Sequence, residues 1–175
     1  MPDAFLERKF EPAITPDDVM AMAAEGADCF GLHGVAWHAS LLAVDGRRMF
    51  CRFSSPDLES VRIALRQAGA DARVLWPGTV LDAPDATQSD QRSVNVVVAR
   101  RFDRPVSVDE LQAAEDANAW CLEAHGVTFL RTCLSVDARR LICLYRAPDA
   151  ESVRIVQREA RLPFESVWSC TPIWP

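Results

Sequence analysis

Short apolar runs typical of strands and longer segments with helix-start signals follow one another along the chain. Thr15 and Pro16 predict a helix start, because a threonine side chain caps free backbone N–H groups and proline suits the first helical turn. Gly34 marks the end of that helix, and Asp45-Gly46 between two alternating segments predicts a hairpin. The predicted elements of the first half are Ala4–Phe10 (strand), Thr15–His33 (helix), Val35–Val44 and Arg48–Ser54 (strands), Ser55–Ala68 (helix) and Arg73–Val80 (strand).

The second half of the chain repeats this pattern at a constant offset of 92 residues. Residues 4–80 align with residues 96–172 without a gap, and 26 of the 77 aligned positions are identical. Such self-similarity indicates that one supersecondary unit was duplicated and fused. The corresponding elements of the second half are Val94–Phe102, Ser107–His125, Val127–Val136, Arg140–Arg146, Asp149–Arg161 and Glu165–Ile173.

The order of elements in each half is β-α-β-β-α-β, which is typical of a ferredoxin-like unit with both helices on one face of an antiparallel sheet. The run Leu141–Tyr145 is apolar on both faces, so we expect the helix-free face to be covered by the sheet of the other repeat. We therefore predict an α+β fold with two ferredoxin-like repeats, paired as a pseudo-dimeric α+β barrel or sandwich. The predicted domains are residues 1–81 and 94–175, with a linker at 82–93. Helices packed back to back, or pairing across a dimer of chains, are the alternatives.

Composition narrows the classes of function. A net charge of −6 and an isoelectric point near 5.1 argue against nucleic acid as a partner, because binding there depends on basic groups. No run approaches the roughly 18 apolar residues of a membrane span, and the first residues do not resemble a secretory signal. We therefore expect a cytoplasmic protein with no membrane partner, in which the six cysteines are reduced thiols.

The most distinctive constellation is Cys29-x-x-x-His33, which recurs as Cys121-x-x-x-His125. Residues four apart share one face of a helix, so a thiolate and an imidazole could approach the same divalent metal ion, nickel or zinc. A structural role is the alternative, because cysteine is common in helix cores and histidine interacts well with the last turn of a helix.

Four further residues are candidates for binding a small ligand. Arg8 and Arg100 recur within apolar first strands, where each could meet an anionic ligand or pair with a helix acid. Trp37 has no matching tryptophan in the second repeat and is a candidate pocket wall, and His38 beside it could line the same seam. Nucleophile and phosphate-loop motifs do not occur, so no residue is predicted to be catalytic.

Several local motifs occur together in both halves. They are Arg8 with Phe10, Asp17-Asp18, Gly34-Val35-x-Trp37, Asp45 to Cys51 and Pro56 to Arg62, with their second-repeat equivalents. This combination resembles a small bacterial ferredoxin-like family first catalogued as a domain of unknown function, one of whose members is described as nickel-binding. The resemblance implies a ferredoxin-like fold, paired units and divalent metal binding. It also implies histidine ligands near the second-strand serine and in the second helix, where this chain has His38 or Ala39 and Ala64. The Cys-x-x-x-His pairs would then have to substitute for them.

These observations favour a non-enzymatic cytoplasmic binding protein whose partner is a metal ion or a small molecule held near the junction of the repeats. A homo-oligomer is compatible with the sequence. The alternatives are a cofactor-free enzyme of the dimeric α+β barrel type, such as a monooxygenase or isomerase, and an assembly or regulatory module without a ligand.

Overall fold

The structure, a computed structural model, describes residues 2–175. The chain divides into two compact units: the first unit is residues 1–79 with 171–175, and the second unit is residues 80–170. The elements that begin in the first unit are β1 (Asp3–Lys9), α1 (Pro16–Leu32), β2 (Ala36–Ala43), β3 (Arg48–Ser54), α2 (Leu58–Gln67) and β4 (Val74–Asp82). Those that begin in the second are α3 (Gln88–Arg92), β5 (Val96–Arg101), α4 (Val108–Ala124), β6 (Thr128–Ser135), β7 (Arg140–Arg146), α5 (Ala150–Glu159) and β8 (Ser166–Ile173).

The long helices begin where side chains satisfy backbone donors that the first turn leaves free. At α1 the Thr15 hydroxyl accepts a hydrogen bond from the Asp18 N–H, and the Asp18 carboxylate accepts one from the Thr15 N–H at 2.8 Å. Ser107 and Glu110 form the same reciprocal pair at α4. These capping boxes confirm the predicted helix starts, and they explain why acidic residues follow the cap in both repeats.

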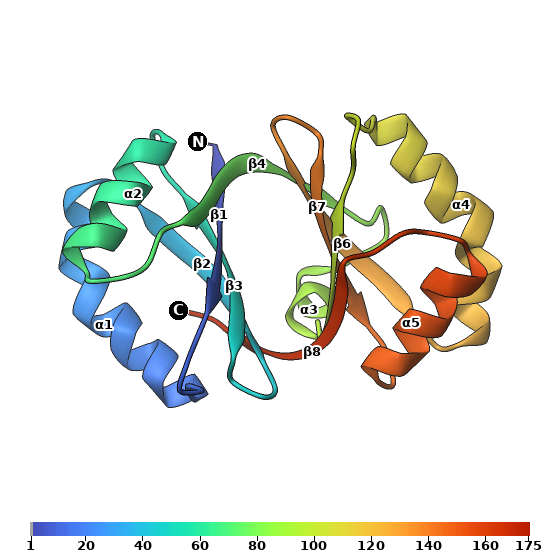
Figure 1. Cartoon of the computed structure of the whole chain (residues 1–175), viewed down its shortest axis with the longest axis horizontal. Coiled ribbons are helices and arrows are strands. Elements are labelled where there is room, and N and C mark those ends of the chain that lie inside the picture. The colour runs from blue at the N-terminus through green and yellow to red at the C-terminus, as the bar shows by residue number, and fades with distance from the viewer. Residues whose placement is uncertain (1) are drawn as a thin grey trace. The chain divides into compact units, whose positions relative to one another are not determined.

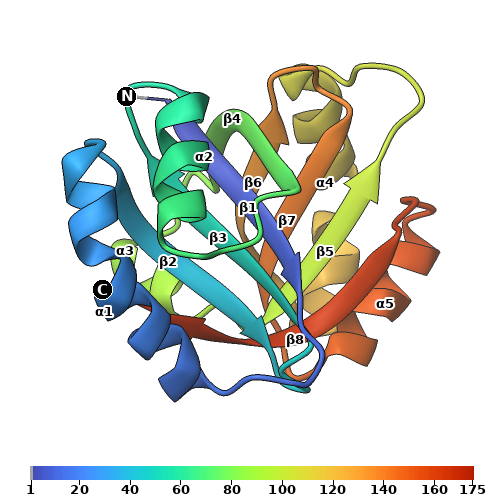
Figure 2. The same ribbon diagram turned by 60° about the vertical axis from the view of Figure 1, so that its left-hand side comes forward.

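The strands of each unit pair antiparallel in equivalent registers. In the first unit β1 lies between β3 and β4, and β2 pairs with β3, as Figure 2 shows for β1, β3 and β2. In the second unit β5 lies between β7 and β8, and β6 pairs with β7. A register shift interrupts β2 between Trp37 and Ala39, and the same shift occurs in β6 between Phe129 and Arg131. The duplicated segments therefore share an irregular feature as well as the regular ones.

The predicted fold class is wrong. The eight strands follow one another in the order β1-β3-β2-β8-β5-β7-β6-β4 as one closed antiparallel barrel, rather than as two ferredoxin-like sheets laid against each other. The apolar pattern of β7 did predict burial correctly, since Leu141 to Tyr145 are all buried. A closed barrel buries both faces of its strands just as a sandwich does, because one face lines the interior and helices cover the other. The pattern therefore could not distinguish the two arrangements.

The two main helices of each unit pack against each other, α1 with α2 and α4 with α5, and cover one face of that unit's strands (Figure 1). Beneath them the first unit has a core that includes Leu6, Val61 and Leu65, together with Ile173 from the end of the chain. The core of the second unit contains the equivalent Val98 and its neighbours. Across residues 2–175, none of the helices is both long enough and apolar enough to cross a bilayer.

The hairpin tips of the two units have the same length but differ in one residue, glycine in the first unit and alanine in the second. Gly46 has a φ of 71°, and Ala138 occupies the equivalent position with a φ of 55°. The carbonyl oxygens of both residues accept a hydrogen bond from the segment before the first helix, from the Ile14 N–H at 3.0 Å and the Val106 N–H at 2.9 Å. A Cβ atom on Gly46 would clash with the backbone carbonyl oxygen of Ile14. Glycine is therefore favoured at position 46 for two reasons: the turn requires a positive φ, and the backbone of Ile14 leaves no room for a side chain.

We expect Gly46→Ala to lower the free energy of unfolding by about 2 kcal/mol or more, because backbone strain in the left-handed region adds to the clash. Ala138→Gly is the matched control, and we expect unchanged or slightly higher stability, since it relieves a positive φ at a side-chain-bearing residue. Urea unfolding of both variants measures the difference. Equal losses of stability in the two variants would contradict the argument.

Candidate metal site in the second unit

Two of the residues singled out by their spacing lie at the end of α4. Cys121 is fully buried on the face of α4 that packs against α5, and His125 is the residue that caps the helix. The His125 backbone N–H donates to the carbonyl oxygens of Cys121 and Leu122, which fixes the imidazole next to the last turn. The four-residue spacing therefore places both side chains on the same side of α4, as predicted.

Glu159, the last residue of α5, completes the cluster. The Cys121 thiol donates a hydrogen bond to Glu159 Oε2 at 3.0 Å, and His125 Nε2 lies 3.2 Å from the same oxygen. The sulfur, the imidazole nitrogen and the carboxylate oxygen all lie within 4.8 Å of one another. A thiolate, an imidazole and a carboxylate at this separation are sufficient to hold one divalent transition metal ion.

The three groups perturb one another. Hydrogen bonds from Cys121 and His125 hold the pKa of Glu159 below its ordinary value. Burial, followed by the hydrogen bond to the negative charge of Glu159, raises the pKa of Cys121 to about 11. The cluster therefore consists of a protonated thiol and an ionised carboxylate that share one hydrogen bond.

The equivalent cluster in the first unit lacks the acid. Cys29 and His33 keep their places on α1, but Gln67 stands where the second unit has Glu159. His33 Nε2 lies 2.9 Å from the Gln67 side-chain oxygen, and Cys29 is only half-buried. An amide is a weaker ligand than a carboxylate and adds no charge, so this pair has less to offer a cation. The four predicted ligands therefore form two separate pairs, of which one is completed by an acidic residue.

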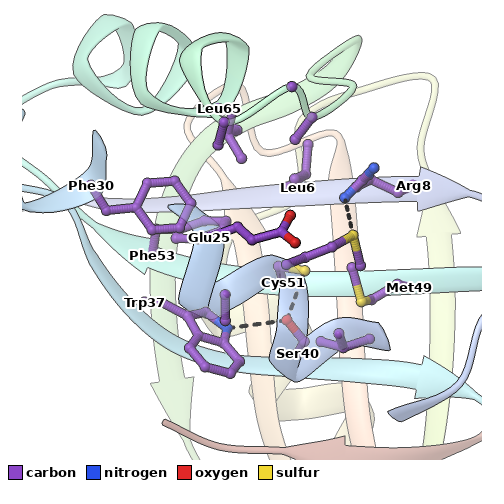
Figure 3. Close-up of a pocket in the computed structure, with 16 residues that line it drawn as sticks. Leu6, Arg8, Glu25, Phe30, Trp37, Ser40, Met49, Cys51, Phe53 and Leu65 are labelled. Atoms are coloured by element: carbon purple, nitrogen blue, oxygen red, sulfur yellow. Dashed lines mark hydrogen bonds between the residues drawn. The ribbon is translucent and has the colours of Figure 1, made fainter. Parts of the chain in front are cut away.

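The candidates for a small ligand are also separated by the structure. Arg8 and Trp37 line one cavity of about 230 Å³ within the first unit, between its helices and its strands (Figure 3). Arg100 does not line that cavity: it is 5% exposed, and its guanidinium donates to the Gln157 side-chain oxygen and to the Pro163 carbonyl oxygen. His38 Nε2 lies 2.8 Å from the Ser54 hydroxyl and is likewise not part of the cavity wall.

Sequence reasoning missed Glu159 and the cavity. The available signal for Glu159 was its position 34 residues after His125, which is the same interval as that from His33 to Gln67. The acid was overlooked because the two repeats differ at this position, glutamine in one and glutamate in the other, and comparison of the repeats draws attention to positions that are identical. The cavity has no sequence motif, since it depends on which side chains leave space unfilled.

Similarities to known proteins extend over both repeats. Residues 5–77 and 97–169 each match the family described as "Nickel responsive protein SCO4226-like". One solved structure of that kind, SCO4226 from Streptomyces coelicolor A3(2), is 20% identical, with 42% of this chain and 90% of that chain covered at a TM-score of 0.39. No curated protein matches the sequence.

Two further solved structures resemble the whole chain. The presumed chlorite dismutase TA0507 is 12% identical and covers 98% of this chain and 94% of its own, with a TM-score of 0.55. A chlorite dismutase variant from Candidatus Nitrospira defluvii is also 12% identical, with 97% and 90% covered and a TM-score of 0.52. At these identities the likeness is one of fold.

The family match confirms the predicted family resemblance in both halves, although the expected domain-of-unknown-function name is not confirmed. The matched segments together cover most of the chain and share the 92-residue offset of the repeats. The chain belongs to the SCO4226-like family of nickel responsive proteins.

Proposed function

We propose that this protein binds one divalent transition metal ion, nickel in preference to zinc, through Cys121, His125 and Glu159. The observation that carries the proposal is the convergence of a thiol, an imidazole and a carboxylate oxygen within 4.8 Å at the ends of two packed helices. On this proposal the ion lies within the second unit rather than at the junction of the repeats.

The chemistry of the donor set supports a metal of intermediate softness. Thiolate and imidazole ligands suit nickel, copper and zinc, whereas magnesium and calcium require mostly oxygen ligands. Membership of a nickel responsive family favours nickel among these ions. Three protein ligands leave at least one coordination position for water or another small ligand.

The site joins the end of α4 to the end of α5, so metal binding has a structural consequence. In the structure a single carboxylate oxygen holds the thiol and the imidazole through hydrogen bonds of 3.0 and 3.2 Å. Replacing these hydrogen bonds with metal–ligand bonds would fasten the two helix ends together and raise the stability of the second unit. A protein can respond to nickel only if the metal-bound and metal-free forms differ in this way, in structure or in stability.

The test is a titration of the full chain with Ni²⁺ and with Zn²⁺ under reducing conditions, followed by calorimetry and by metal analysis after ultrafiltration. We expect one ion per chain and a near-ultraviolet thiolate-to-nickel absorption band. Cys121→Ala, His125→Ala and Glu159→Gln are each expected to weaken binding at least tenfold, and Cys121→Ala to abolish the band.

The matched controls are Cys29→Ala and His33→Ala, which change the equivalent residues of the first unit. We expect both to leave the stoichiometry and the absorption band unchanged. A titration that detects no bound ion, or binding that survives in the double variant Cys121→Ala with His125→Ala, would overturn the proposal.

A further inference from the structure

The duplicated arginines of β1 and β5 have diverged in their surroundings. The guanidinium of Arg100 is buried and donates to the side-chain oxygen of Gln157 and to the Pro163 carbonyl at 2.8 Å. In the first unit the position of Gln157 is occupied by Leu65, which offers no acceptor. The same arginine is therefore held by an internal acceptor in one repeat and not in the other.

Arg8 retains unused hydrogen-bonding capacity. Its Nε atom is buried and has no hydrogen-bond partner among residues 2–175, and its Nη1 only approaches the Met22 sulfur at 3.7 Å. The guanidinium carbon lies 4.7 Å from the centre of the Phe10 ring, which orients the plane of the group. A buried donor without an acceptor costs about 1–3 kcal/mol, so this arrangement is favourable only where an acceptor can arrive.

The cavity beside Arg8 has the character of a binding pocket for an apolar group. Its volume of about 230 Å³ has room for on the order of ten non-hydrogen atoms. Figure 3 shows the side chains of Leu6, Phe30, Phe53 and Leu65 around this space. In the second unit, a cavity that shares some of the equivalent wall positions, among them Phe129 and Thr132, has a volume of only about 40 Å³.

The remaining polar groups of the wall restrict the charge of a ligand. The Trp37 Nε1–H donates to the Ser40 hydroxyl at 3.1 Å, and that hydroxyl donates to the Cys51 sulfur at 2.9 Å, so these donors are already used. Glu25 is exposed and also lines the cavity, and its negative charge offsets part of the attraction of Arg8 for an anion, so a ligand with one negative charge is favoured over one with several. Arg8 is thus the group with spare donors, and it is a cation whose planar fork matches a carboxylate.

We propose that this cavity binds a small hydrophobic monocarboxylate, with the carboxylate on the Arg8 guanidinium and the apolar part between the aromatic side chains and Leu65. The site lies entirely within the first unit and does not depend on the proposed metal site. Binding satisfies the unpaired Nε donor and removes apolar surface of the ligand from water.

The experiment uses 3-phenylpropanoate as the probe and 3-phenylpropan-1-ol as its neutral analogue, each titrated into the full chain and followed by ligand-observed NMR and calorimetry. We expect saturable binding of the carboxylate at one site per chain. The alcohol is expected to bind at least tenfold more weakly, because it cannot form two charge-assisted hydrogen bonds with Arg8. Equal affinity for the two compounds, or no binding of the carboxylate, would overturn the proposal.

Two variants separate a binding role of Arg8 from a structural one. Arg8→Met keeps the aliphatic stem and removes the charge, and Leu65→Gln introduces the residue that engages Arg100 in the second unit. We expect Arg8→Met to weaken binding of the carboxylate at least tenfold without lowering the melting temperature. Leu65→Gln should weaken binding to a similar extent, with some loss of stability because Leu65 is buried in the core of the first unit. Arg101→Met, a change at an exposed arginine of β5, is the control and should leave the affinity unchanged. Undiminished affinity in both Arg8→Met and Leu65→Gln would refute the assignment.

Discussion

Gln67→Glu is expected to raise the metal stoichiometry from one ion per chain to two. The substitution supplies the first unit with the acid that its cluster lacks, at a position where the Gln67 side-chain oxygen already lies 2.9 Å from His33 Nε2. Cys29 stands four residues before His33 on α1, as Cys121 does before His125 on α4. A carboxylate in place of the amide adds the negative charge that favours a cation.

The second ion should bind more weakly than the first, because Cys29 is half-buried whereas Cys121 is fully buried and better shielded from water. Calorimetric titration with Ni²⁺ measures both sites, and the thiolate-to-nickel band should increase in proportion. Combining Gln67→Glu with Glu159→Gln provides the control, since it should leave the first-unit site as the tighter one. If the Gln67→Glu chain still binds only one ion, the missing carboxylate is not the reason why the first-unit cluster binds no metal.

Arg100→Met is expected to lower the free energy of unfolding by about 2–4 kcal/mol. The guanidinium satisfies the Pro163 carbonyl oxygen and the side-chain oxygen of Gln157, and Gln157 is itself only 1% exposed. Methionine fills much of the same volume but leaves the buried side-chain oxygen of Gln157 without this donor and removes the hydrogen bond to the Pro163 carbonyl. Relief of the buried positive charge offsets part of that loss, which sets the lower end of the range.

Arg8→Met is the matched comparison, and its effect on the free energy of unfolding should stay within about 0.5 kcal/mol. Its Nε atom has no acceptor to lose within the described chain. Denaturant unfolding compares the two variants, and amide hydrogen exchange should place the loss caused by Arg100→Met in the second unit. Similar losses for both arginines would mean that Arg8 is also a structural residue.

The elements of the fold were predictable because their signals are local. Thr15 and Ser107 cap their helices in the structure, and Gly46 forms the turn that the Asp-Gly pair indicated. Closure of the barrel could not be predicted in the same way. It depends on which strands become neighbours, and the apolar residues of β7 are equally compatible with a sandwich.

The candidate metal site was predictable only in part. Helical spacing brought Cys121 and His125 together, since Cys121 lies in the last turn of α4 and His125 caps the same helix. Glu159 comes from another helix, and its proximity depends on how α5 packs against α4. The cavity beside Arg8 could not be predicted from a motif. It depends on how the surrounding side chains pack, among them Leu65, where the second repeat has a glutamine.

Ile173 belongs to the core of the first unit although it is synthesised long after residues 1–79, which form the rest of that unit. Residues 1–79 leave the ribosome on the order of ninety residues earlier, which corresponds to roughly 5–20 s of synthesis. During that interval the nascent N-terminal segment lacks one of its own apolar side chains and exposes the surface that Ile173 later covers. Co-translational folding of this protein therefore cannot finish in the order in which the halves are made, and loss of residues 171–175 would damage the half that was translated first.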